Sequence, residues 1–356
     1  MRLATEQNCK NAALHVASAD GIGEIGDELY NGGEVVGTSS VGTPHVVNFG
    51  AMRYTAVGDA ATERLVARVL EEISGEIRAI GLEKLAGVYL GGGYGRGEGG
   101  APLYNDLDFF VLTDGASEAE KDAITRRLGE LGARHSRELG VDVDFCRAKN
   151  ELDFKKVERR LMIQEFLQGF VPVYGSREAL DFLKRFPAGQ LPVTEALRLL
   201  VNRGMGLLLA RKSDDPDFVR RNINKAVLGA GDARLIMEGR YAWKALERAA
   251  LLDDRDYDRA LEFKFRPVCQ VATWELGHEK WLREVRRLQE MQGRAIRCPA
   301  PRHALRWLAR RHTVGSWRTF GMDPLYRILL PLERQLAGNG STAMQESLMK
   351  DWSIFN

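Results

Sequence analysis

Two aspartates spaced by one residue follow a glycine-crowded turn in the segment GVYLGGGYGRGEGGAPLYNDLDFFVLTDG, residues 87–115. Asp106 and Asp108 open a predicted strand, in which residues i and i+2 project from the same face. Two carboxylates held side by side raise each other's pKa unless a cation bridges them. Oxygen ligands of this kind suit Mg²⁺, which takes one or two carboxylates and completes its shell with substrate phosphates.

A second pair of carboxylates follows in VDVDF, where Asp142 and Asp144 also share a strand face. If the two strands are neighbours, three carboxylates converge and can hold two metal ions, the arrangement used for in-line phosphoryl transfer. We choose Asp144 over Asp142 as the third ligand, because the middle of this strand and not its entry should lie opposite Asp106 and Asp108.

The glycine turn supplies a candidate site for the phosphates themselves. Gly91, Gly92 and Gly93 leave their backbone N–H groups unobstructed, and a turn that runs into a helix can cradle phosphate oxygens. Arg96 would either add a positive charge beside those oxygens or tether the loop.

Other glycine loops fit less well. The segment lacks the Gly-Lys-Ser/Thr ending of a Walker A loop. Gly95-x-Gly97-x-x-Gly100 matches the dinucleotide pattern, but it leads into a strand and not into a helix. The following valine and the catalytic Asp-Asn loop of protein kinases are also missing from the sequence.

GGGYGRGE followed by DLD resembles the DNA polymerase beta superfamily of nucleotidyltransferases, in particular its small bacterial and antibiotic-modifying branch. Gly92 and Gly93 match the Gly-Gly/Ser positions of that family, and Asp106 and Asp108 match its paired metal ligands. Asp144, or else Asp142, matches the third carboxylate. Asn105 stands where many members have serine. The resemblance covers roughly residues 60–176.

The resemblance implies transfer of a nucleoside monophosphate from a nucleoside triphosphate, with pyrophosphate leaving and ATP as the default donor. It implies two Mg²⁺ ions, or Mn²⁺ in their place, bound by Asp106, Asp108 and Asp144. The third carboxylate of the family can also assist deprotonation of the acceptor. The acceptor is expected to be a small molecule or a protein.

A helical domain follows the catalytic domain in many members of the family, and it closes over the nucleotide. Lys225 and Arg221 are therefore candidates to bind the triphosphate, and Asp232 is a candidate to contact the acceptor. The alternative for each is a solvated charge on a helix. A non-catalytic or regulatory module of the same fold, such as a toxin–antitoxin partner, and an RNA-tailing enzyme are the alternative functions.

Hydrophobic periodicity supports this fold class. We predict an α/β (α+β) domain with a small mixed sheet, followed by helices. The proposed domains are an irregular arm at 1–58, a catalytic domain at 59–176 and a helical domain at 177–356. The strands are predicted at 86–91, 106–112, 141–148 and 170–176, and the catalytic-domain helices at 61–77, 117–139 and 151–169. Ser117, with Glu120 three residues later, has the spacing of a capping box and is the predicted N-cap of the helix at 117–139. Later helices are predicted at 191–212, 215–252, 256–265, 273–292, 304–312 and 323–337.

Composition adds few constraints. The net charge of +2 is neutral on nucleic-acid binding, and four dispersed cysteines without a CxxC pair argue against structural zinc and fit a reducing cytoplasm. No apolar run is long enough for a membrane span, and the N-terminus lacks the apolar core of a signal peptide. Between Lys280 and Arg318, eleven basic residues interleave with three tryptophans. We interpret this segment as amphipathic helices in preference to an RNA-binding surface. The sequence does not indicate the oligomeric state.

Overall fold

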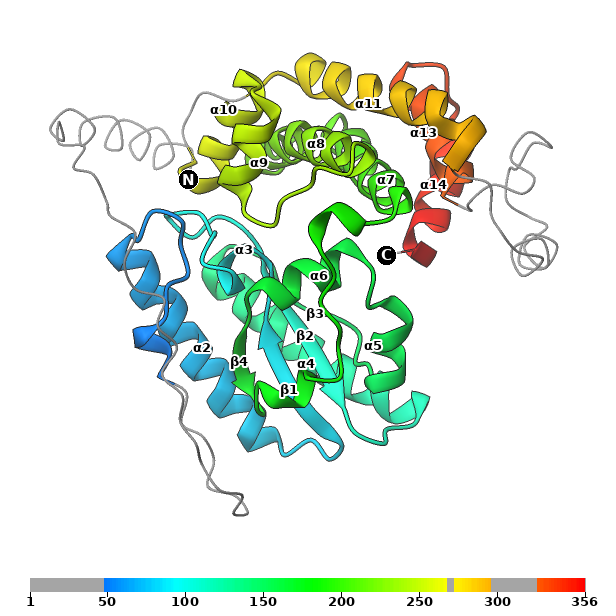
Figure 1. Cartoon of the computed structure of the whole chain (residues 1–356). Helices are drawn as coiled ribbons and strands as arrows, with labels where there is room; N and C mark the ends of the chain where they lie inside the picture. The colour runs from blue at the N-terminus through cyan, green and yellow to red at the C-terminus, as the bar shows by residue number, and fades with distance from the viewer. Residues whose placement is uncertain (1–47, 268–271, 296–324, 356) are drawn as a thin grey trace, which may run out of the picture. The chain divides into compact units, whose positions relative to one another are not determined.

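The computed structural model of the protein describes residues 48–267, 272–295 and 325–355 (Figure 1). Residues Phe49–Asn356 form one compact unit. Most of the predicted N-terminal arm lies outside the described residues. Its final part contains the 3-10 helix η2 (Phe49–Ala51), and the backbone N–H groups of Tyr54 and Thr55 donate to the carboxylate of Glu63 at 2.7 and 2.9 Å.

A mixed four-stranded sheet forms the centre of the N-terminal half, as predicted. Its strands are β1 (Leu85–Leu90), β2 (Leu107–Thr113), β3 (Val143–Phe145) and β4 (Val171–Tyr174), in the order β3-β2-β1-β4. β1 is antiparallel to β2 and to β4, whereas β2 and β3 are parallel. β4 is an edge strand, which is consistent with Pro172, because proline cannot donate to a ladder.

Helices flank this sheet. α2 (Ala60–Ile80) packs against β4, and α4 (Glu118–Leu139) packs against β3 (Figure 1). α2 begins at the N-cap Asp59, whose side chain accepts from the N–H of Thr62. α4 begins at the predicted capping box of Ser117 and Glu120. Local capping signals therefore fix where both long helices begin.

The single helix predicted over residues 151–169 is wrong, because two helices stand there. They are α5 (Glu151–Val157) and α6 (Leu161–Gln168), separated by the extended residue Arg160. The side-chain amide of Gln164 donates to the carbonyls of Glu158 and Lys184 at 2.7 and 2.8 Å. This tertiary hydrogen bonding satisfies a carbonyl that a continuous helix would have satisfied itself.

The remaining described elements are helical. They are η3 (Glu178–Leu180), η4 (Ala188–Gln190), α7 (Val193–Ala210), α8 (Pro216–Met237), α9 (Ala245–Leu252), α10 (Arg255–Phe265), α11 (Trp274–Ala295), α13 (Tyr326–Leu336) and α14 (Thr342–Phe355). α7 packs on α8, α11 and α13 around one hydrophobic cluster. The predicted helix at 304–312 lies outside the described residues.

Two features of this helical region depart from the prediction. The helix predicted over 215–252 ends at Met237, with Glu238 as its C-cap, because Gly239 adopts a left-handed conformation (φ +68°) and the N–H of Arg240 donates to the carbonyl of Leu235. α14 was not predicted, although Ser341 supplies a capping signal and its hydroxyl accepts from the N–H of Met344.

None of the helices within the described residues combines the length and the apolar character that a membrane crossing requires.

Candidate active site

The glycine turn connects β1 to a short helix, α3 (Gly92–Gly95). The N–H of Gly91 donates to the carbonyl oxygen of Asp108 at 2.8 Å, so the turn is fastened to β2. Gly92 has a left-handed backbone (φ +60°), and a Cβ at this position would lie 2.5 Å from Oδ2 of Asp108. Glycine is required at residue 92 because a carboxylate occupies the space that a side chain would need.

The three predicted aspartates lie on two adjacent strands. In the parallel ladder between β2 and β3, Asp108 is paired with Asp144. Asp106 directly precedes β2, and Asp142 precedes β3, where its carbonyl accepts from the N–H of Leu107. This register places Asp144 opposite Asp108 and Asp142 two residues earlier in the chain, and the choice between them as the third ligand stays a prediction.

The charges of these carboxylates are coupled. Burial, followed by the charge of Asp106, raises the pKa of Asp108 from 3.8 to about 6; Asp144 adds to this rise and Lys225 opposes it. Burial, followed by Asp142 and Asp106, also raises the pKa of Asp144. The site therefore concentrates negative charge that its own cations neutralise only in part.

Two cations of α8 reach this acidic centre across a long stretch of sequence. Lys225 Nζ lies 2.8 Å from Oδ2 of Asp106, and Arg221 Nη1 lies 3.5 Å from Oδ1 of the same residue. The Arg221 guanidinium also lies over the ring of Tyr104, 5.6 Å from its centroid. Both side chains were predicted to bind a triphosphate. In the structure they act as counter-ions of a predicted metal ligand.

Arg96 has a different set of contacts. Its Nε lies 3.5 Å from a carboxylate oxygen of Glu98, and its Nη1 lies 3.5 Å from a carboxylate oxygen of Glu165 on α6. Only 11% of the Arg96 side chain is exposed. Of the two roles that the sequence left open for Arg96, these contacts favour the tether of the glycine turn over a direct contact to phosphate.

Glu165 joins this tether to the helical region. The hydroxyl of Tyr241 donates to Glu165 Oε1 at 2.6 Å, and Arg248 Nη1 lies 3.9 Å from the same oxygen. Arg248 Nε also contacts Oδ1 of Asp232 at 2.8 Å, to which the hydroxyl of Tyr257 donates at 2.7 Å. Asp232, a candidate for an acceptor contact, is thus engaged by two protein groups.

Sequence reasoning missed Glu165 and Arg248. Glu165 did carry a readable signal, because it is the only charged residue in the apolar helical segment LMIQEFLQG. A carboxylate in the middle of such a segment is expected to be buried and paired. The partner could not be read from the sequence, because Arg248 lies in a separate helix of the C-terminal half.

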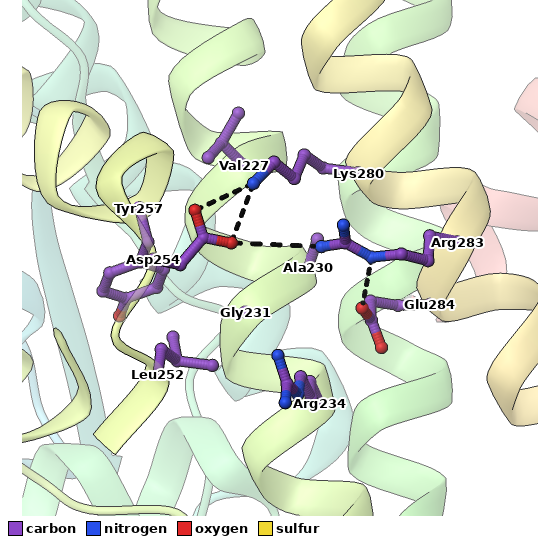
Figure 2. A pocket seen from close by; sticks show the side chains of 10 residues that line it. All are labelled: Val227, Ala230, Gly231, Arg234, Leu252, Asp254, Tyr257, Lys280, Arg283 and Glu284. Atoms are coloured by element: carbon purple, nitrogen blue, oxygen red, sulfur yellow. Dashed lines mark hydrogen bonds and ion pairs between the residues drawn. The ribbon is translucent and has the colours of Figure 1, made fainter. Parts of the chain in front are cut away.

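A small cavity of about 10 Å³ lies among α8, α9, α10 and α11, with none of the predicted site residues in its wall. Figure 2 shows Lys280 directed at the carboxylate of Asp254, where Nζ lies 2.8 Å from both oxygens. Arg283 contacts Asp254 and Glu284 beside it (Figure 2). Trp281 is fully buried and donates from Nε1 to the carbonyl of Leu200 at 2.7 Å. In the described part of the basic segment, these residues hold helices together.

The donor set at the aspartates suits a hard divalent cation. In the described ranges of the chain, however, no group of three or more His, Cys, Asp or Glu side chains is arranged so that it could hold a metal ion. Lys225 and Arg221 neutralise Asp106 in this arrangement. Mg²⁺ takes one or two carboxylates and adds phosphate oxygens, so two of these carboxylates would hold the ion only together with a nucleotide.

Comparison with known proteins identifies the domain that carries these residues. Residues 70–168 match the family model described as a nucleotidyltransferase domain, a segment that contains the glycine turn and all three aspartates. No curated protein sequence matched the chain. The solved structure of spectinomycin adenyltransferase AAD(9) from Enterococcus faecialis with ATP and spectinomycin is similar at 12% identity and a TM-score of 0.38. The match covers 64% of this chain and 98% of that one. We draw no inference on the substrate from a likeness of that size.

Proposed function

We propose that the protein transfers AMP from ATP to a small-molecule or protein acceptor and releases pyrophosphate, because residues 70–168 match the model of a nucleotidyltransferase domain. The observation that carries the proposal is the alignment of Asp106, Asp108 and Asp144 beside a glycine turn, with two cations of α8 reaching Asp106. In this proposal, residues 59–176 carry the chemistry and residues 177–356 close over the nucleotide.

The proposed roles of the residues follow from their surroundings. Two Mg²⁺ ions, or Mn²⁺ in their place, held by Asp106, Asp108 and Asp144, would neutralise charge on the transferred phosphoryl group. Lys225 and Arg221 are released from Asp106 when that carboxylate gains another counter-ion, and they then bind phosphate oxygens. Gly92 and Gly93 give the phosphate chain close access to the backbone, and Arg96 holds the turn in place.

The transfer itself needs one proton acceptor. The acceptor's nucleophilic oxygen forms a bond to the α-phosphorus, the bond to the bridging oxygen breaks, and pyrophosphate leaves with that electron pair. The proton of the acceptor goes to Asp144, whose side chain is accessible to solvent. Partial burial, followed by the charges of Asp142 and Asp106, raises the pKa of Asp144. A raised pKa brings a carboxylate closer to the value that suits a general base near neutral pH.

Four nucleoside triphosphates, each with Mg²⁺ or Mn²⁺, test the proposal by thermal shift and then by pyrophosphate release with pools of candidate acceptors. We expect ATP to raise the melting temperature only when the metal is present. Asp106→Asn, Asp108→Asn and Asp144→Asn should each lower turnover by at least about a hundredfold, in the range of losses typical for charge-stabilising groups.

Asp142→Asn is the matched control, because Asp142 is an exposed carboxylate on the same strand segment, and it should retain turnover. The reverse result for Asp144 and Asp142 would show that the register is off by two residues. Binding of no nucleotide by the wild-type chain would overturn the proposal, and binding without turnover would favour the non-catalytic alternative. Extension of an RNA oligonucleotide would favour the RNA-tailing enzyme.

A further inference from the structure

Arg203 on α7 is a cation near the active site that lacks a protein partner. Among the residues that the structure describes, no hydrogen bond and no ion pair of its guanidinium group is found, and its Nε is buried without a partner. Arg203 is half-buried. Arginine keeps its charge in proteins, and burial of one of its donors without a partner is unfavourable. The stability of the fold therefore does not explain why an arginine stands at this position.

The position of Arg203 is built into the packing of two helices. A Cβ at Gly229 of α8 would lie 2.4 Å from Cγ of Arg203 and 3.1 Å from its Nε. Glycine at 229 therefore makes room for the arginine to lie across α8. On that helix, Lys225 precedes Gly229 by four residues and Asp232 follows it by three, so all three positions share one face.

The charges around Arg203 show where along α8 it lies. Burial lowers the pKa of Arg203, and the carboxylates of Asp232, Glu165, Asp106 and Asp108 oppose that change. Asp106 and Asp108 belong to the acidic centre, whereas Glu165 and Asp232 belong to the network that holds the glycine turn. Arg203 is thus placed between these two groups, yet no carboxylate of the described residues lies within ion-pair distance of it.

We propose that Arg203 binds a phosphate group of the nucleoside triphosphate, an inference that rests on the proposed function. A phosphate chain bound at the aspartates would lie near Arg203, because the charges of Asp106 and Asp108 act on this side chain. The planar guanidinium group can make two parallel hydrogen bonds to phosphate oxygens, which a lysine cannot reproduce. A phosphate of the bound nucleotide thus serves as the counter-ion that no carboxylate of the described residues provides, and Arg203 is a binding residue on the α7–α8 face.

Calorimetric titration of the full chain with Mg²⁺ and a non-hydrolysable α,β-methylene triphosphate tests this role. Arg203→Gln should raise the dissociation constant at least about tenfold, the lower end of what a hydrogen bond to a charged group contributes. Arg203→Lys should recover only part of that loss. Inorganic tripolyphosphate should show the same ratio between wild type and variant, while binding of the nucleoside without phosphates should not change.

Arg198→Gln is the matched control, because Arg198 lies on the same helix and is already paired with Glu195 at 3.4 Å. It should leave the triphosphate affinity unchanged. Melting temperatures separate binding from a structural role: Arg203→Gln removes an unpartnered charge and should not lower the melting temperature of the ligand-free protein.

An unchanged dissociation constant for Arg203→Gln, with wild-type binding intact, would overturn the role of Arg203 and leave the proposed function standing. A lowered melting temperature together with unchanged affinity would assign Arg203 to the fold instead. Absence of triphosphate binding by the wild-type chain would be the failure of the proposed function itself.

Discussion

Replacement of Glu165 by glutamine should destabilise the fold strongly, because Glu165 is the charge that joins the glycine turn to the helical region. Arg96 and Arg248 lie 3.5 and 3.9 Å from its two oxygens, and Tyr241 donates to it at 2.6 Å. Only 20% of the side chain is exposed. Burial would raise the pKa of Glu165, but Arg96, Arg248, Tyr241 and Lys264 together lower it from 4.5 to about 2.

The size and the pH dependence of the effect follow from that change in pKa. A fall from 4.5 to about 2 corresponds to about 3 kcal/mol of folding free energy at pH 7, close to the loss of about 3–5 kcal/mol seen when one partner of a buried pair is removed. Because the folded-state pKa is lowered, this contribution is complete above about pH 5 and is lost as the pH falls toward 2. The difference between wild type and Glu165→Gln should shrink over the same range.

Urea unfolding followed by tryptophan fluorescence measures the difference. At pH 7, the variant's midpoint should fall by about 1 M or more, given typical denaturant slopes. Glu72→Gln is the matched control, because Glu72 is 51% exposed and lies 3.8 Å from Arg68 in a surface pair, which contributes at most about 0.5 kcal/mol. Equal urea midpoints for the two variants at pH 7 would refute a stabilising role of the buried ion pairs of Glu165. A difference between wild type and Glu165→Gln that does not shrink in acid would refute it as well.

Two further substitutions test the acidic centre. Asp108→Asn should stabilise the ligand-free protein, in EDTA, by up to about 3 kcal/mol at pH 7, because burial and Asp106 raise the pKa of Asp108 from 3.8 to about 6. The effect on stability has the opposite sign to that of Glu165→Gln, so the difference in stability between wild type and Asp108→Asn should disappear as the pH falls from about 6 to 4. A lower melting temperature of Asp108→Asn than of wild type would contradict the unfavourable burial of Asp108 beside Asp106. Gly92→Ala should lose about 1 kcal/mol or more, because its Cβ would meet Asp108 at a left-handed position. Gly93 has no left-handed backbone, and the nearest atom to a Cβ there would be the carbonyl oxygen of Glu98 at 3.3 Å. Gly93→Ala should therefore melt nearer to wild type, and identical melting of the two alanine variants would count against the contact of residue 92 with Asp108.

The parts of the fold that sequence predicted are those that depend on neighbouring residues. The alternation at 106–112 indicated a strand, and the Ser117 capping box indicated where α4 begins. The break between α5 and α6 was missed because it depends on the amide of Gln164 reaching the carbonyl of Lys184, 20 residues away. Gly239 was a readable stop for α8, but the apolar pattern on both sides of it outweighed that signal.

The candidate site divides in the same way. The sequence was sufficient to place Asp106 and Asp108 at the start of one strand and Asp144 on another, and the two strands are neighbours with Asp108 opposite Asp144; the joint metal site of the three carboxylates stays a prediction. The requirement for glycine at 92 was only partly predicted. The sequence suggested that phosphates need access to its backbone, whereas in the structure a side chain at residue 92 would collide with the carboxylate of Asp108. The partner of Asp106, Lys225, lies 119 residues away, and no local pattern reports a contact of that range.

The distribution of charge across the site explains why the same cations fit both a ligand-free and a nucleotide-bound protein. Asp106 is neutralised by Lys225 and Arg221, while Asp108 keeps a raised pKa because Lys225 offsets only part of the effect of burial and of Asp106. A divalent cation at the carboxylates would compete with Lys225 and Arg221 for Asp106 and set both free at the moment when phosphate oxygens arrive. Arg203 has no carboxylate partner among the described residues, so it can bind a phosphate without first breaking an ion pair. If the proposed function holds, cations of both kinds on one α7–α8 face would let phosphate binding follow metal binding without a rearrangement of the helices.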